Sequence, residues 1–177
     1  ILSQVGQSVL WIPYHNEQFS KNIAAEFESR GINRDRLVFA TQLELMADHL
    51  ARYALADLFL DCYPYSAQTT ALDSLKTGVP LLTLQGKSLC SRMASSILSA
   101  IDLPELITTS EEEYERLAVN LASNPAKLAN IKQKVLDNRF TTTLFNTRLY
   151  TKHIEVAYKK IMERHWSGLP IDHINIQ

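Results

Sequence analysis

The chain has little glycine and lacks the short motifs of glycine-rich sites. Only five of its 177 residues are glycine, and no apolar run is followed by Gly-x-Gly-x-x-Gly, which argues against a nicotinamide or flavin dinucleotide site. The absence of Gly-x-x-x-x-Gly-Lys-Ser/Thr excludes a P-loop. No Asp-x-Asp pair is present to hold a divalent ion under a diphosphate. We therefore expect neither a cofactor nor metal ligands.

Charge of one sign and long apolar runs are also missing. The 18 basic and 19 acidic residues give a formal net charge of -1, so the sequence predicts no nucleic-acid or membrane partner. No run approaches the roughly 20 apolar residues of a membrane span, and no basic flank indicates a signal peptide. The chain starts at Ile1 rather than Met, and we expect it to be cut from something longer. Its 46% hydrophobic content predicts one soluble globular domain.

Cysteine is scarce as well. Cys62 and Cys90 lie in or near apolar segments, which predicts small, reduced core residues in a cytoplasmic protein rather than a disulfide framework. The five histidines are scattered, so Ser-His-Asp or Cys-His catalysis has no local signature.

The segments that are present alternate between strand and helix. Short apolar runs predict strands at 8–12, 36–40, 55–61, 79–84 and 105–108. Helical spacing predicts helices between them, at 19–27, 47–53, 69–77 and 88–100. This order predicts an α/β fold with a doubly wound, Rossmann-like parallel sheet. Three C-terminal helices follow, with starts at Ser110, Asn124 and Asn146, and residues 169–177 are expected to form a tail.

The most informative segment is 57–80, which predicts a buried strand, a polar turn and a helix that starts at Thr69 or Thr70 and ends at Gly78. Two adjacent hydroxyls at a helix start lie beside unpaired backbone N–H groups and the positive end of the helix dipole, where a phosphate is well placed. An ordinary Thr N-cap explains the same pattern. The residues alone leave both interpretations open.

In such folds, nucleotides bind in a crevice formed by the loops at the carboxyl ends of the strands. Three segments of this chain are candidates to line it. The first is the Thr69-Thr70 turn, with Asp73 one turn later to bind ribose hydroxyls. The second is the loop 40–49, whose His49 could stack on a base. The third is 85–88, where a glycine allows a tight turn. A lone His or Asp is more often structural or solvated than a ligand contact.

Several motifs follow one another in an order far more specific than any one of them: 8–11, 31–39, 49–52, 55–61, 69–70, 78–80, and 91–92 with 144–146. In this order they resemble the C-terminal catalytic lobe of the O-linked N-acetylglucosamine transferases. The resemblance covers the chain from about residue 1 to residue 170.

The resemblance implies that residues 1–168 are the nucleotide-sugar-binding half of a two-lobed GT-B glycosyltransferase, with the other lobe and tetratricopeptide repeats upstream. It implies inverting, metal-independent transfer of N-acetylglucosamine from UDP-GlcNAc to Ser or Thr of a protein acceptor. The catalytic base is expected upstream, so this chain holds none. The residues implied at the donor are His49 on the uracil, Thr69 and Thr70 at the diphosphate, Asp73 at the ribose, Tyr65 near the sugar and Gln68 before the Thr pair.

Two positions depart from the family pattern. The family usually has His where this chain has Gln68, and Lys or a similar donor where it has Met46. Gln68 can donate a hydrogen bond to phosphate but cannot carry positive charge. Two alternatives stay open: a Spindly-like protein O-fucosyltransferase lobe that uses GDP-fucose, and a non-catalytic nucleotide-binding or protein-interaction lobe.

Overall fold

The structure is a computed structural model that describes residues 1–176, and its five strands pair in parallel. Strand β1 (Leu10–Pro13) pairs with β2 (Leu37–Ala40). Strands β3 (Phe59–Leu60), β4 (Leu81–Leu84) and β5 (Ile107–Thr108) form a second sheet in the order β3-β4-β5. The predicted α/β class with parallel strands is confirmed, and the strand pairing within the described residues falls into two sheets.

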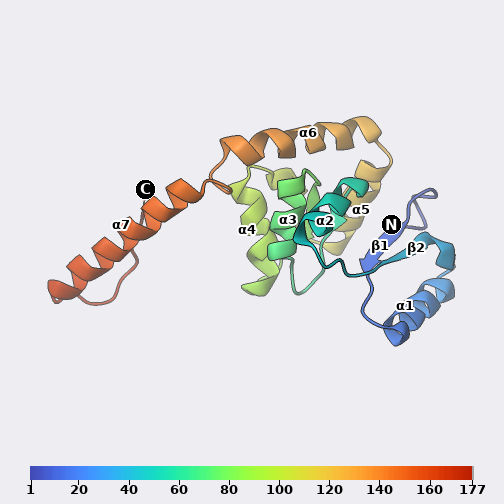
Figure 1. Ribbon diagram of the computed structural model, residues 1–177, viewed down its shortest axis with the longest axis horizontal. Helices are drawn as coiled ribbons and strands as arrows, with labels where there is room; N and C mark the ends of the chain where they lie inside the picture. Colours follow the sequence, from blue (N-terminus) through green and yellow to red (C-terminus); the bar gives the residue numbers. More distant parts are fainter. Residues whose placement is uncertain (177) are drawn as a thin grey trace.

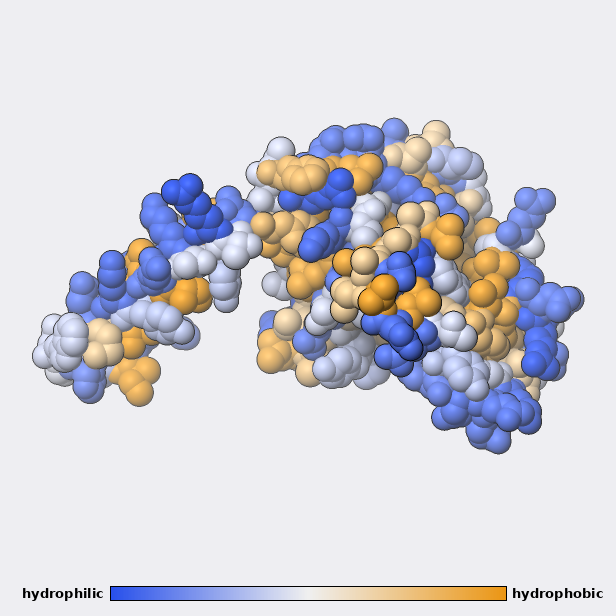
Figure 2. All heavy atoms as spheres, viewed as in Figure 1, coloured by the Kyte–Doolittle hydropathy of each residue, from blue (hydrophilic) through white to orange (hydrophobic). Residues whose placement is uncertain are grey.

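The first sheet and its crossover helix lie at one end of the molecule (Figure 1). Helix α1 (Glu17–Ser29) begins after Asn16, whose side chain accepts the Phe19 N–H at 2.8 Å. The predicted apolar positions of this helix are half-buried, and its outward face carries hydrophilic side chains (Figure 2). The strand, helix and strand predicted for this region are confirmed.

The core lies around β4. Leu81 and Leu82 are neighbours in this strand and therefore point to opposite faces, yet both are 0% exposed. Helices α3 (Thr69–Thr77), α4 (Met93–Ala100) and α5 (Glu111–Ala122) all contact β4. The burial of both leucines confirms that helices cover the two faces of this sheet.

Three predicted elements are shorter than expected. The third strand covers only residues 59–60, the two that pair with β4, and helix α2 (Met46–Ala51) continues into a 3-10 helix, Arg52–Leu55, that takes the first residue of the predicted range. The predicted helix 88–100 starts as the 3-10 turn Cys90–Arg92 before α4. The fifth strand is reduced to two residues because Pro104 opens a 3-10 turn over the first half of its predicted range.

The C-terminal helices start where their caps predict. Ser110, Asn124 and Asn146 each accept a backbone N–H three residues later, at the starts of α5, α6 (Pro125–Thr141) and α7 (Thr147–Trp166). Helix α6 crosses one side of the body and α7 points away from it (Figure 1). Residues 169–176 turn back along α7, and the last residue of the predicted tail, 177, lies outside the described residues. No helix within 1–176 has the length and apolar composition that a bilayer crossing needs.

Gly78 ends α3 in the left-handed conformation, with φ +92°. A Cβ added here would lie 2.6 Å from Cδ2 of Leu136 on α6. Gly31 has a similar φ, +75°, but a Cβ there would meet no atom within 4 Å. Substitutions at the two glycines therefore distinguish the free-energy cost of the left-handed backbone from the cost of a clash between α3 and α6.

We expect Gly31→Ala to lower the free energy of unfolding by about 1–2 kcal/mol, because the left-handed conformation disfavours a Cβ. Gly78→Ala should cost roughly 3 kcal/mol, since overpacking against Leu136 adds to the same conformational term. Urea unfolding of the 177-residue chain measures both changes. Equal losses would mean that Leu136 moves aside at no cost.

Candidate functional site

The loop between β3 and α3 is held by a buried carboxylate. Asp61 directly follows β3 and is 7% exposed. Its Oδ1 accepts the backbone N–H groups of Cys62 at 2.9 Å and Ala67 at 2.7 Å, and its Oδ2 accepts the Thr83 hydroxyl at 2.6 Å. The Tyr114 hydroxyl donates to the backbone carbonyl of Asp61 at 2.9 Å. Burial raises the pKa of the Tyr114 phenol, and Asp61 and Cys62 raise it further, so this group remains a donor.

The loop after β4 lies beside this first loop. The Ser66 hydroxyl donates to the Cys90 carbonyl at 2.6 Å, which joins the β3–α3 loop to the start of the α4 region. A Cβ on Gly86 would overlap the Ser91 hydroxyl and lie 3.0 Å from the ring of Tyr63. Glycine at 86 therefore permits the close approach of the two loops. The structure brings the predicted segments 69–70 and 85–88 to one edge of the second sheet.

Helix α3 begins without a side-chain cap. Its N-cap residue is Gln68, which has φ -122° and ψ -88° and whose side chain accepts no backbone N–H of the helix. The interpretation of a Thr as N-cap is therefore wrong, because Thr69 and Thr70 lie inside the first turn. Both are exposed, and within residues 1–176 neither side chain is hydrogen-bonded. The first N–H groups of α3 and the positive end of its dipole thus remain open to an anion.

His49 is held by a neighbouring arginine. Arg52 Nη2 lies 2.9 Å from His49 Nδ1, and because a guanidinium only donates, Nδ1 accepts and the proton of the neutral ring is on Nε2. Arg52 Nη1 donates to the Thr41 carbonyl at 2.8 Å, and its guanidinium lies 5.9 Å from the Trp11 ring. The His49 ring meets Tyr53 edge to face at 5.5 Å. These contacts fix the imidazole between the first sheet and α2.

Asp73, on α3, lies near Tyr53, the residue that contacts the His49 ring. Helices α2 and α3 contact each other, and the pKa of the Tyr53 phenol is raised by burial and further by the nearby Asp73 carboxylate, while Arg52 opposes the shift. Asp73 is four residues after Thr69 and three after Thr70, so it shares a helix face with both. The predicted base, ribose and diphosphate residues therefore lie along one continuous surface from α2 to the start of α3.

The remaining predicted residues lie at the rim of this surface. Tyr65 is 65% exposed, and Gln68 Nε2 lies 3.3 Å from its hydroxyl. Met46, the first residue of α2, is 66% exposed and brings no charge. Figure 2 shows hydrophobic side chains around α2, where Leu45 and Leu55 are exposed as well.

Sequence reasoning was wrong about the cysteines as core residues. Both are free, but Cys62 is exposed in the loop after β3, and Cys90 is only half-buried at the start of a 3-10 turn. Burial of the Cys62 sulfur and the adjacent Asp61 raise the pKa of its thiol, so it is no activated nucleophile. Sequence reasoning also missed Arg52 and Asp61. The signals were present: Arg52 follows His49 by one helical turn, and Asp61 ends an apolar run.

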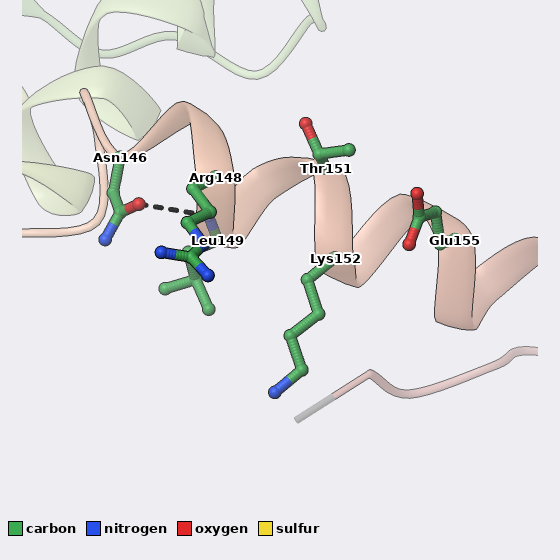
Figure 3. A pocket seen from close by; sticks show the side chains of 6 residues that line it. All are labelled: Asn146, Arg148, Leu149, Thr151, Lys152 and Glu155. Atoms are coloured by element: carbon green, nitrogen blue, oxygen red, sulfur yellow. Dashed lines mark hydrogen bonds between the residues drawn. The ribbon is translucent and has the colours of Figure 1, made fainter.

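A surface hollow lies away from these residues. It measures about 600 Å³ and lies along the first turns of α7 (Figure 3), lined by Asn146, Arg148, Leu149, Thr151, Lys152 and Glu155. A second hollow of about 320 Å³ runs from Gln85, at the end of β4, along α4. Within residues 1–176, no three His, Cys, Asp or Glu side chains converge as a metal site.

Comparisons with known proteins identify the family of the chain. The chain is 37% identical, over 98% of its length, to a UDP-N-acetylglucosamine–peptide N-acetylglucosaminyltransferase of Caenorhabditis elegans. It is 34% identical, over 99% of its length, to SEC of Arabidopsis thaliana, a probable UDP-N-acetylglucosamine–peptide N-acetylglucosaminyltransferase. It spans only 15% and 18% of these two relatives. A solved O-GlcNAc transferase mutant from Thermobaculum terrenum superposes with a TM-score of 0.84 at 28% identity, over 90% of this chain and 31% of that one.

Plant relatives named SPINDLY match at lower identity, 29% in Eustoma exaltatum. Their printed name also specifies UDP-N-acetylglucosamine, so the GDP-fucose alternative finds no support. The model of glycosyl transferase family 41 matches residues 1–154. With most of its length matched by that model, this chain belongs to glycosyl transferase family 41.

Proposed function

We propose that this chain is the nucleotide-sugar half of a protein O-glycosyltransferase that moves N-acetylglucosamine from UDP-GlcNAc to Ser or Thr hydroxyls. The observation that carries the proposal is the start of α3, where Thr69 and Thr70 are exposed and the helix has no side-chain cap. No hydrogen bond among residues 1–176 uses either hydroxyl. A diphosphate at this position would accept hydrogen bonds from both hydroxyls and from the first backbone N–H groups of the helix.

The nucleoside end of the donor fits the corner beside α2. The His49 ring stacks on the uracil, and Arg52 fixes the orientation of that ring. The Asp73 carboxylate, one turn into α3, accepts hydrogen bonds from the ribose hydroxyls. UDP would then lie along the surface between α2 and α3, with its uracil, ribose and diphosphate in the order in which they are joined.

In the reaction, an acceptor hydroxyl oxygen attacks the anomeric carbon of the sugar from the face opposite the diphosphate. The new C–O bond forms as the bond to the β-phosphate oxygen breaks, and UDP leaves with the electron pair. The hydroxyl proton goes to a base outside this chain. Thr69, Thr70 and the α3 amides stabilise the charge that builds on the departing diphosphate, and removal of one such donor typically costs roughly 10²-fold to 10³-fold in rate.

Tyr65 and Gln68 lie where the sugar would enter. Gln68 donates to the β-phosphate in place of its weak contact with Tyr65, and the exposed Tyr65 ring forms one wall beside the sugar. The other wall, the base and the tetratricopeptide repeats belong to further parts of the protein, since the chain spans so small a share of its relatives. A cytoplasmic location, consistent with two free cysteines, is part of the same proposal.

We expect the double change Thr69→Ala with Thr70→Ala to weaken UDP binding at least about 10-fold to 100-fold, because each hydrogen bond to a charged group contributes about 1.5–3 kcal/mol. Uridine affinity should change little, since uridine lacks the diphosphate. Thermal unfolding should be unaffected, because neither hydroxyl bonds the fold. Calorimetric titration of the full-length protein with both ligands measures these affinities. Equal losses of affinity for UDP and uridine would mean that the two threonines do not bind the diphosphate.

His49→Ala should weaken UDP and uridine by a similar factor, about tenfold, because both ligands lose the same stacking contact with the base. The same titrations measure it. His15→Ala is a matched control, since His15 is also next to an aromatic ring but lies in the loop between β1 and α1. A loss confined to UDP would place His49 at the phosphates instead of the base.

UDP binding should be unchanged in EDTA, because hydroxyls and backbone amides, not a cation, meet the diphosphate. Titration of the full-length protein with and without the chelator tests this expectation. A loss of affinity greater than about threefold, restored by added Mg²⁺ or Mn²⁺, would contradict it.

A further inference from the structure

We infer that Asp61 is a positioning residue for the donor diphosphate: its carboxylate fixes the β3–α3 loop and thereby the amino end of α3. This inference rests on the proposed function. Asp61 itself is buried and does not touch the donor. It acts through the loop that carries Tyr65 and Gln68 and through the helix start that carries the two threonines.

The carboxylate closes the loop on itself. One oxygen, Oδ1, accepts the N–H of Cys62, where the loop begins, and the N–H of Ala67, where it ends. The loop is therefore clamped at both ends by one atom. Ala67 immediately precedes Gln68, the N-cap residue of α3. The bond to Ala67 is the last fixed point before the groups that would meet the diphosphate.

The second oxygen ties this clamp to the sheet. Oδ2 accepts the hydroxyl of Thr83, a fully buried residue of β4, and the Thr108 hydroxyl of β5 donates to the Thr83 carbonyl at 2.9 Å. Tyr114 of α5 holds the backbone carbonyl of Asp61. Strand β4 thus holds the Asp61 side chain directly, β5 supports Thr83, and α5 holds the backbone of Asp61, so the loop is anchored to the sheet.

Stability alone does not require a charge here. A buried carboxylate is costly to desolvate, and within residues 1–176 no Lys or Arg forms an ion pair with Asp61. Three hydrogen-bond donors meet its oxygens instead, and such charge-assisted bonds are shorter and more directional than neutral ones. A polar side chain thus takes the place of an apolar one at this buried position, and its hydrogen bonds fix the geometry of the loop.

The side chains of the loop show what the clamp controls. Ser66, between the clamped ends, is 1% exposed and bonded to the Cys90 carbonyl. Tyr63 and Tyr65, on the same loop, are 55% and 65% exposed. A short loop that exposes two tyrosines beside the helix start needs internal anchors, and Asp61 and Ser66 are the two buried polar side chains that provide them.

The test compares Asp61→Ala, Asp61→Asn and Thr83→Val in the full-length protein, with Val135→Ala as a control that removes buried volume in α6, away from the loop. Asp61→Ala should weaken UDP about tenfold and lower kcat by up to about 100-fold, with a smaller change in KM, because misplacement of the helix start affects the transition state most. Uridine affinity should change less than about threefold. Asp61→Asn retains an acceptor for both N–H groups and should fall between Asp61→Ala and the wild type.

Thr83→Val, which removes only the donor to Oδ2, should resemble Asp61→Asn, and Val135→Ala should leave the ratio of UDP to uridine affinity unchanged. An unchanged ratio in folded Asp61→Ala would overturn the inference, as would Asp61→Asn binding UDP more tightly than the wild type. If Asp61→Ala does not fold, the Asn and Val variants decide in the same way.

Hydrogen exchange of the Ala67 and Gln68 amides separates this inference from the proposed function. Faster exchange in the Asp61 variants, together with a wild type that binds no UDP, would mean that the clamp exists and the proposed function fails. A wild type that binds UDP, with variants that exchange and bind as it does, would mean that the positioning role fails.

Discussion

Leu81 and Leu82 occupy adjacent positions of β4 and are both sealed from solvent, and the rest of the fold depends on this double burial. Because neighbouring strand residues point to opposite faces, helices must cover both sides of the sheet. Parallel pairing of β3, β4 and β5 follows from the crossovers that place those helices. It also brings the carboxyl ends of the strands, and the loops after them, to one edge. The site is a consequence of how the core is covered.

The polar groups at that edge divide into two kinds. Asp61, Ser66, Thr83 and Thr108 are buried and have partners inside the protein. Thr69 and Thr70, a few residues away, are exposed, and in the described part of the chain their hydroxyls have no partner. The buried set determines where the backbone lies, and the exposed pair is left available. The same division holds at the other corner, where Arg52 is engaged with Thr41 and His49 while a nitrogen of the imidazole, Nε2, is not.

Local signals in the sequence predicted the features that local chemistry determines. Ser110, Asn124 and Asn146 cap the helices that they were expected to cap, since an N-cap bond spans only three residues. Gly78 ends α3 as predicted. Predictions that depended on distant neighbours did less well. The third strand was predicted over 55–61, but only residues 59 and 60 pair with β4. The roles of Asp61 and Arg52 depend on partners such as Thr83 and Trp11, far away in sequence, and no spacing rule could identify them.

Trp11 lies beneath the guanidinium that orients His49, whereas Trp166 stands at the far end of α7, 75% exposed. These are the only two tryptophans of the chain. Their fluorescence therefore reports on two separate places. Emission from Trp11 senses a displacement of Arg52, and emission from Trp166, which is exposed and remote, serves as an internal reference. The protein therefore carries its own optical probe of the proposed nucleoside site, without any added label.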